Sequence, residues 1–281
     1  MLLPASYLNG FAPRDGQPLY PSLWRGCVFA AAPCLGPTGL TLRDWSGQAN
    51  HGTLTNMDAG TDWTPLRGRY GLDFDGSNDV VTTQSGSESL YDFTDATSKF
   101  SISIWAMDRS ATARGSLVFS KGTAASANGG YYIDLGQDFT GTNATKGYCT
   151  LYFGSSRWTG VNFPFPANVL NHLLIVVDMT LSGTDRCAAW VNGVRSTETF
   201  SQNPLSTLAG NSNPITLGNA TTNNLPFDGV LQEARIYNRA LPPDEIRTLA
   251  TRPGIAYEMA PRRRSSVQVT TNRLRRALIG S

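Results

Sequence analysis

The sequence predicts an all-β domain, either a sandwich or a barrel of antiparallel strands, with one short helix near its C-terminal end. Extended apolar or alternating runs recur along the chain, with turn residues between them at intervals of about eight to twelve residues. The 281 residues include 28 Gly and 16 Pro, and only 16% are charged, against about a quarter in an average protein. Helical periodicity occurs in a single segment. A β domain of this length can form one unit.

The expected strands follow one another through the whole central part of the chain. Residues 27–31 are apolar, as in a buried strand, and residues 100–109 (FSISIWAMDR) show the cleanest alternation of apolar and other residues. Residues 80–83 are β-branched, which suits an edge or a half-buried strand. The expected strands cover residues 27–31, 40–42, 52–55, 71–75, 80–83, 100–109, 115–120, 130–135, 147–153, 172–178, 186–191, 214–217 and 230–238.

Turns, loops and one helix complete this expectation. Asn192-Gly193 stands between apolar residues, which is the strongest short-range signal of a β-hairpin. Residues 57–71 and 84–98 are expected to be loops. In LPPDEIRTLAT, proline stands at a helix start, acids follow in the first turn and apolar residues recur at helical spacing, so we predict a helix over about residues 244–250.

Both ends of the chain differ from its centre. Residues 1–22 contain four prolines and no periodicity, which indicates an irregular N-terminal arm. Residues 252–281 contain seven Arg and one Glu, a charge of 7 − 1 = +6, so the other residues carry 2 − 6 = −4. We therefore expect an arm over residues 1–22, a domain over residues 23–251 and a basic extension over residues 252–281.

The segment DWSGQANHGTL, residues 44–54, joins a polar turn to a strand. Its Asp, Asn and Gly residues are turn formers, because Asp and Asn bond their own backbone and Gly adopts positive φ. A carboxylate, several carbonyls and an Asn or His in one turn also describe a hard-cation site built from oxygens. The residues leave two interpretations open: a turn capped by Asp44, or a cation site.

Six segments follow in a recognisable order: DWSGQANHGTL, LDFDGSNDVV, FSISIWAMD, WVNGV, ITLGNA and FDGVLQEARIYNRALPPDEI. Over about residues 24–250 this succession resembles the laminin-G-like, concanavalin A-like jelly-roll domains. The resemblance implies a two-sheet antiparallel jelly-roll sandwich. It is less specific for function, because that sandwich is found in lectins, glycosidase accessory modules, adhesion domains and structural spacers. The flanking segments resemble such domains in bacteriophage structural proteins.

The resemblance also implies a calcium ion between the polar turn and the final strand. Its ligands would be Asp44, the turn residues Gly47, Asn50 and His51, and Glu233 of the final strand. The family's usual pair of acids in that strand is replaced here by Gln232-Glu233. One carboxylate is therefore missing, and the number of carboxylates strongly affects calcium affinity.

Two tryptophans are candidate sugar platforms, since the C–H face of a sugar ring packs on an indole. Trp63 and Trp158 fall in segments expected to be loops, where either could contact a glycan or pack beneath its own loop. The other tryptophans in the matching segments, Trp45, Trp105 and Trp190, are expected in the core.

The sequence argues against an enzyme. Asp73 and Asp75 share one face of a strand, as a glycosidase pair would, but they stand at a strand-to-turn junction where an Asx-turn role is the simpler interpretation. The E-x-D-x-x-E pattern of related glycosidases is absent. His172 is expected at the surface or half-buried, and no nucleophile elbow or phosphate loop occurs.

The basic extension is expected either to be solvated or to dock on a partner protein, in which case the contacts would be made by Arg262, Arg263, Arg264, Arg273, Arg275 and Arg276. Nucleic acid is a weaker interpretation, because no aromatic residues are interleaved with these arginines. The first residues lack the pattern of a signal peptide, and no apolar run is long enough for a membrane span. The four cysteines leave open whether Cys27/Cys34 or Cys149/Cys187 form disulfides.

These observations predict a non-catalytic recognition or structural module that is displayed on a virion surface or is extracellular. It would bind a glycan or a host-surface polysaccharide and attach to other structural proteins through its two termini. The alternatives are a pure assembly or decoration protein without glycan affinity and, with least support, a glycosidase. Whether the chain forms a homo-oligomer stays open.

Overall fold

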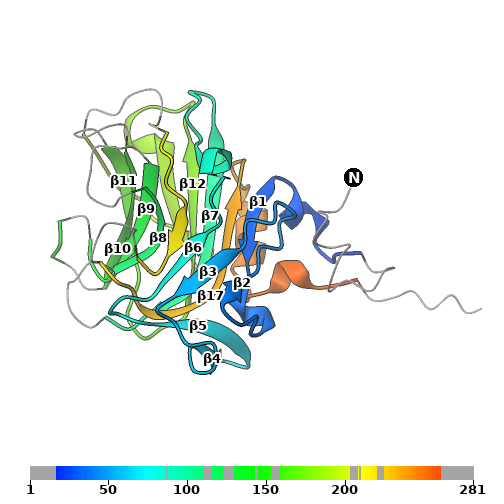
Figure 1. The fold of residues 1–281 in the computed structure, drawn as a ribbon. Coiled ribbons are helices and arrows are strands. Elements are labelled where there is room, and N and C mark those ends of the chain that lie inside the picture. Colours follow the sequence, from blue (N-terminus) through cyan, green and yellow to red (C-terminus); the bar gives the residue numbers. More distant parts are fainter. Residues whose placement is uncertain are drawn as a thin grey trace, which may run out of the picture.

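A computed structural model describes residues 17–86, 88–110, 116–122, 130–138, 140–142, 145–152, 158–202, 208, 210–219 and 225–260, with only the backbone given at 152, 158, 201 and 202. Within these residues the chain forms a sandwich of two antiparallel β-sheets and one α-helix (Figure 1). The predicted fold class is confirmed.

The first sheet has the strand order β14-β13-β12-β7-β17-β5-β4, and β1 pairs with the free part of β17. The long strand β17 pairs with β7 along one edge, and its other edge is shared between β5 at the beginning and β1 at the end. The strands are β1 (Cys27–Ala31), β4 (Trp63–Leu66), β5 (Arg69–Asp75), β7 (Lys99–Asp108), β12 (Asn171–Asp178), β13 (Cys187–Val191), β14 (Val194–Arg195) and β17 (Asp228–Tyr237).

The second sheet has the order β15-β11-β10-β9-β8-β16-β6-β3-β2. Its strands are β2 (Thr41–Leu42), β3 (Gly52–Thr55), β6 (Val80–Thr83), β8 (Ser116–Lys121), β9 (Gly130–Leu135), β10 (Lys146–Tyr152), β11 (Trp158–Pro164), β15 (Glu198–Gln202) and β16 (Ile215–Leu217). The helical elements are α2 (Pro243–Leu249) and the short 3₁₀ turns η1 (Pro21–Trp24), η2 (Pro33–Leu35), η3 (Glu88–Tyr91), η4 (Gly183–Arg186) and η5 (Ile255–Tyr257).

Strand β7 explains how the sandwich is held together. Phe100, Ile102 and Ile104 lie on one face and join the main hydrophobic core between the sheets. Complete burial of such a side chain contributes about 1.5–3 kcal/mol. The opposite face is covered as well, and Trp105 there donates a hydrogen bond from Nε1 to Leu249 O of α2 (3.1 Å). A second hydrophobic cluster on this side includes Trp24 of η1 and residues of α2 and η5. Figure 1 shows these N- and C-terminal elements beside β1.

The compact body is longer than the predicted domain of residues 23–251. Pro18 pairs with Met259, and the Ala260 N–H donates to Gln17 O at 2.8 Å. Ile255 and Ala256 are buried in the second cluster. Residues 17–22 and 252–260 are therefore part of the folded body, so the predicted boundaries with the arm and the extension do not coincide with its edges. The structure describes none of the remaining residues of either end.

Several local predictions are confirmed and others are wrong. The helix forms as predicted, and the Asn192-Gly193 turn joins β13 to β14 with φ values of 50° and 80°. Residues 57–71 are not a loop, because they contain β4 and the start of β5. Strands β11 and β15 were not predicted. Residues 84–98 include η3, whose Tyr91 is completely buried.

Candidate functional site

Asp44 caps its own turn. Its side chain is buried, and Oδ1 accepts hydrogen bonds from the backbone N–H groups of Ala30 and Ser46, both at 2.9 Å. Oδ2 accepts from Ser46 Oγ at 2.8 Å and from the Asn50 N–H at 3.0 Å. Because Ala30 belongs to β1, this carboxylate also fixes the turn to the first sheet. These are backbone and hydroxyl donors that would otherwise be buried without a partner.

The other predicted calcium ligands also have partners in the protein. The Asn50 side-chain amide donates to Tyr91 Oη (2.7 Å), and His51 Nδ1 accepts from the Asp44 N–H (3.1 Å). Glu233 accepts from Arg235 Nε at Oε1 and from the Gly254 N–H at Oε2 (2.6 Å). Gly47 has a φ of 95°, which suits its place in the turn.

This donor set does not fit a calcium ion. A carboxylate has about four acceptor positions, and all four hydrogen bonds of Asp44 come from the protein itself. Glu233 is neutralised by Arg235. Within the described part of the chain, no three His, Cys, Asp or Glu residues are grouped so that they could hold a metal ion. Of the two interpretations of the turn, these hydrogen bonds support the one in which Asp44 caps its own turn.

Glu233 and Arg235 form a completely buried pair that joins β17 to the C-terminal segment. The guanidinium carbon of Arg235 lies 4.6 Å from the ring centre of Trp24 and 4.5 Å from that of Tyr257. Such cation–π contacts partly compensate the loss of hydration of a buried arginine. Glu233 meanwhile holds the backbone at Gly254. These two charges therefore serve to fold the chain.

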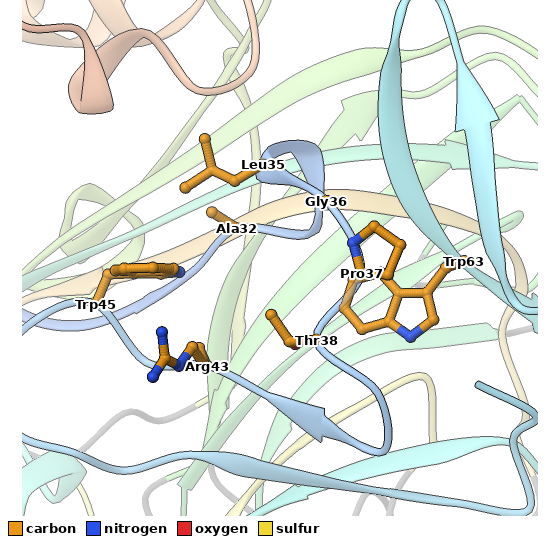
Figure 2. A pocket seen from close by; sticks show the side chains of 8 residues that line it. All are labelled: Ala32, Leu35, Gly36, Pro37, Thr38, Arg43, Trp45 and Trp63. Carbon is orange, nitrogen blue, oxygen red and sulfur yellow. The ribbon is translucent and has the colours of Figure 1, made fainter. Parts of the chain in front are cut away.

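A small pocket lies at the outer side of η2 between two tryptophans (Figure 2). Trp45 and Trp63 stand on opposite sides in this view, with Thr38 between them. The pocket has a volume of about 60 Å³. It is lined by Ala32, Leu35, Gly36, Pro37, Thr38, Arg43, Trp45 and Trp63.

Each tryptophan of this pocket presents only a small part of its ring. Trp63 is 6% exposed, is the first residue of β4 and donates from Nε1 to Gly39 O (3.0 Å). It therefore packs in the core and lines the pocket at once, and the prediction that it lies in a loop is wrong. The Arg43 guanidinium carbon is 5.4 Å from the centre of the Trp45 ring and is exposed beside it.

Trp158 is the first residue of β11 and not part of a turn. Its register partners are Tyr152 of β10 and Gln202 of β15. The side chain of Trp158 is outside the described part of the structure. The predicted partner-binding residues also lie outside the described residues: Arg262, Arg263, Arg264, Arg273, Arg275 and Arg276.

A larger pocket, which the sequence did not suggest, lies where the β4–β5 hairpin meets the end of α2. Its volume is about 320 Å³. The lining brings together arginines from the hairpin and from the segment after the helix with an indole of β7. The lining residues are Arg67, Arg69, Trp105, Leu170, Gln232, Thr251, Arg252 and Pro253.

The acids and histidine that could suggest catalysis are engaged elsewhere. Asp73 forms an ion pair with Arg109, which also contacts Asp228. Asp75 accepts a hydrogen bond from the Ser77 N–H, as in an Asx turn. His172 is completely buried, which corrects the expectation of a surface position, and burial lowers its pKa to about 3. Among the described residues, no carboxylate lines either pocket.

Asp134 is a buried acid that the sequence analysis did not single out. Asp134 of β9 accepts hydrogen bonds from the Ser116 N–H (2.9 Å) and from Tyr148 Oη (3.2 Å). Burial raises its pKa to about 7, although these hydrogen bonds act in the opposite direction. It contributes to neither pocket. The sequence left open whether the four cysteines form disulfides. In the structure all four are buried free thiols.

The fold and the two pockets define a β-sandwich of the jelly-roll type whose pockets contain tryptophan and arginine and lack carboxylates. A family model described as the concanavalin A-like lectin/glucanases superfamily matches residues 75–247, which is more than half of the chain. The protein belongs to this family. No curated protein sequence matches it.

Solved structures with the same fold include binding domains of toxins and a domain of a sugar-degrading enzyme. The binding domain of Paraclostridial Mosquitocidal Protein 1 is 18% identical, with a TM-score of 0.57 and coverage of 81% of this chain and 52% of that one. The binding domain of botulinum neurotoxin DC in complex with SialylT is 16% identical, with the same TM-score and coverage. The chain thus spans about half the length of these toxin domains.

Domain 4 of AbnA, a GH43 extracellular arabinanase from Geobacillus stearothermophilus, is matched over nearly its whole length. It was solved in complex with arabinotriose, is 21% identical and has a TM-score of 0.56, and the match covers 80% of this chain and 98% of that one. At these identities the likeness shows the fold alone. Among the described residues, no helix is long and apolar enough to cross a membrane.

Proposed function

We propose that this protein is a non-catalytic glycan-binding module. The observation that carries the proposal is the pocket between Trp45 and Trp63, which offers indole edges and the Arg43 guanidinium without a carboxylate. Indole surface packs against sugar C–H groups, and a guanidinium donates hydrogen bonds to hydroxyl oxygens. Membership of a family of lectins and glucanases, and a full-length likeness to a domain bound to arabinotriose, support this choice.

The pocket's size suggests how a sugar would bind. A volume of about 60 Å³ holds only part of a monosaccharide. The rest of the ligand would lie over the exposed neighbours Pro37, Thr38 and Arg43. Such a contact buries little area, so single-site binding is expected to be weak and to gain strength from several copies.

The described residues of the two pockets do not favour glycoside hydrolysis. A glycosidase needs two carboxyl groups about 5–10 Å apart on either side of the bond that is cleaved. The part of the chain that the structure describes contributes no carboxylate to either pocket, and Asp73 is held by Arg109. These contacts support a module that binds without cleaving.

The test is a glycan array on the wild-type protein, once with millimolar calcium and once with EDTA, followed by the variant Thr38→Trp. Thr38 is exposed at the centre of the pocket, so a larger side chain there covers the mouth without entering the core. Thr53→Trp, at an exposed position of β3, is the matched control. We expect binding that is lost in Thr38→Trp and kept in Thr53→Trp and in EDTA. Binding to no glycan in either buffer, or equal binding by both variants, refutes the proposal.

A second candidate, a structural or decoration protein held by its ends, is favoured by a separate observation. Ala260 and Gln17 are joined by a hydrogen bond, so the two ends of the chain leave the folded body at neighbouring points. Attachment there would leave the opposite loops free. Display on a virion surface or outside the cell would suit this candidate and the glycan-binding module alike. Deletion of residues 1–16 and 261–281, which spares the folded body, should abolish association with a partner protein. Unchanged assembly counts against this function.

A further inference from the structure

The larger pocket carries an excess of positive charge. Arg67, Arg69 and Arg252 line it, and none of the described lining residues is an acid. Arg252 forms an ion pair with Glu258, whereas Arg67 and Arg69 have no ion pair within the described part of the chain. Two arginines at one pocket without a counter-charge leave room for an anionic ligand.

Arg67 occupies a backbone position that does not suit it. Leu66 pairs with Arg69 in the β4–β5 hairpin, so Arg67 and Gly68 form a two-residue turn. Their φ values are 51° and 77°, the left-handed region in which Asn and Gly are favoured. An arginine is uncommon there, and an unfavourable backbone position can mark a functional site.

Two polar contacts fix the pocket's shape. The Gln232 amide donates to Leu66 O at 2.9 Å, which ties the hairpin turn to β17 at its bulge. Trp105 donates from Nε1 to Leu249 O, so the polar edge of the indole is already used. The part of Trp105 that lines the pocket is therefore apolar, like Leu170 and Pro253. The pocket thus combines cationic walls with an apolar side.

We propose that this pocket binds the carboxylate of an acidic saccharide, with Arg67 and Arg69 as the recognising groups. Arginine meets a carboxylate with two parallel hydrogen bonds. The volume of about 320 Å³ falls at the lower end of the range of about 300–1,000 Å³ found for organic ligands. An inorganic anion would leave this space and its apolar side empty. The choice of a saccharide rests on the proposed glycan-binding function, while the need for a negative charge rests on the arginines alone.

The test is calorimetric titration of the full-length protein with trigalacturonate, a sialylated trisaccharide and the methyl ester of trigalacturonate. The ester keeps the size of the ligand and removes its charge. Arg67→Asn suits the turn at least as well as the wild-type residue, so loss of binding cannot come from unfolding. Arg69→Gln is the second variant. Arg195→Gln, an exposed arginine of β14 away from the pocket, is the control.

We expect one of the acids to bind and the ester to bind at least about tenfold more weakly. Each pocket variant should lose about tenfold or more in affinity for the acid, which is the effect of losing a charged hydrogen bond. Arg195→Gln should bind as the wild type does. Equal affinity of acid and ester, equal affinity of Arg67→Asn and wild type, or no binding of either acid overturns the inference.

Thr38→Trp separates this inference from the proposed function. It covers the other pocket, so it should abolish binding of neutral sugars and leave binding of the acid intact. If neutral sugars bind and the acids do not, only the inference fails. If the acids bind through Arg67 and no neutral sugar binds, only the Trp45–Trp63 pocket fails as the glycan site.

Discussion

Replacing Asp134 by Asn should make the protein more stable at alkaline pH. Burial raises the pKa of this carboxyl from 3.8 to about 7, and the nearby Asp108 adds to the effect. The folded protein therefore keeps the proton at pH values where the unfolded chain has lost it. Since the unfolded state binds fewer protons, the free energy of unfolding decreases as the pH rises from about 4 to about 7. Asparagine carries no charge and avoids this loss.

The size of the effect follows from the pKa difference. A shift of about three units at about 1.4 kcal/mol each amounts to about 4 kcal/mol over the whole range. About 3 kcal/mol of this decrease in unfolding free energy falls between pH 5 and pH 8. The amide oxygen of Asn can still accept the hydrogen bond from the Ser116 N–H, so the folded geometry should survive.

The measurement is urea unfolding of wild type and Asp134→Asn at pH 5, 8 and 9. The difference in unfolding free energy should move in favour of the variant by about 3 kcal/mol from pH 5 to pH 8, with little further change at pH 9. His172, whose lowered pKa makes folding less favourable as the pH falls below 6.5, is present in both proteins and cancels. A difference that is the same at pH 5 and pH 8 would refute the reasoning.

Three further measurements test other parts of the structure. Glu233→Gln leaves Arg235 buried without its counter-charge and should cost about 3–5 kcal/mol in urea unfolding; a loss below about 1 kcal/mol would contradict the buried pair. Deletion of residues 261–281 should leave the melting temperature unchanged, whereas deletion of residues 252–281 removes buried side chains and should lower it by many degrees; equal melting temperatures would be inconsistent with this packing. Millimolar calcium should not raise the melting temperature, because the oxygens of Asp44 and Glu233 already accept hydrogen bonds; a rise reversed by EDTA would show that calcium binds.

The sequence predicted mainly the strands that have an apolar or alternating pattern. The strands that it missed have a weaker pattern for physical reasons. Strand β4 lies at the end of the first sheet and contains Pro65, which an edge strand tolerates. Strand β15, at the end of the second sheet, is the mostly polar sequence ETFSQ. Its neighbour β11 contains Gly160, where a Cβ would lie 2.1 Å from Cys149 O. Edge strands need little apolar surface, so their sequences carry a weak signal.

The candidate sites were harder to predict than the fold. Trp63 was selected for its residue type, and it does line a pocket, although its segment was misassigned. The arginine pocket joins Arg67 to Arg252, and these distant residues come together because β5 pairs with β17 and Gln232 of β17 holds the β4–β5 turn. No local pattern contains that information. The positive φ at Arg67 could have been suspected, because the following Gly68 is typical of a tight turn.

The distribution of charge in the sandwich indicates where its binding specificity can reside. The charges that lie within the sheets are matched: Asp44 by backbone donors, Glu233 by Arg235, and Lys121 by Asp92. A buried charge that is released from its partner costs several kcal/mol, so these groups cannot be exchanged for contacts with a ligand. At the β4–β5 hairpin, by contrast, Arg67 and Arg69 have no ion pair within the described residues, and Arg67 stands in a turn position that Asn or Gly would suit better. At the site proposed above, selectivity for a ligand would be set by Arg67 and Arg69, which belong to neither hydrophobic cluster, so the same fold is compatible with different ligands.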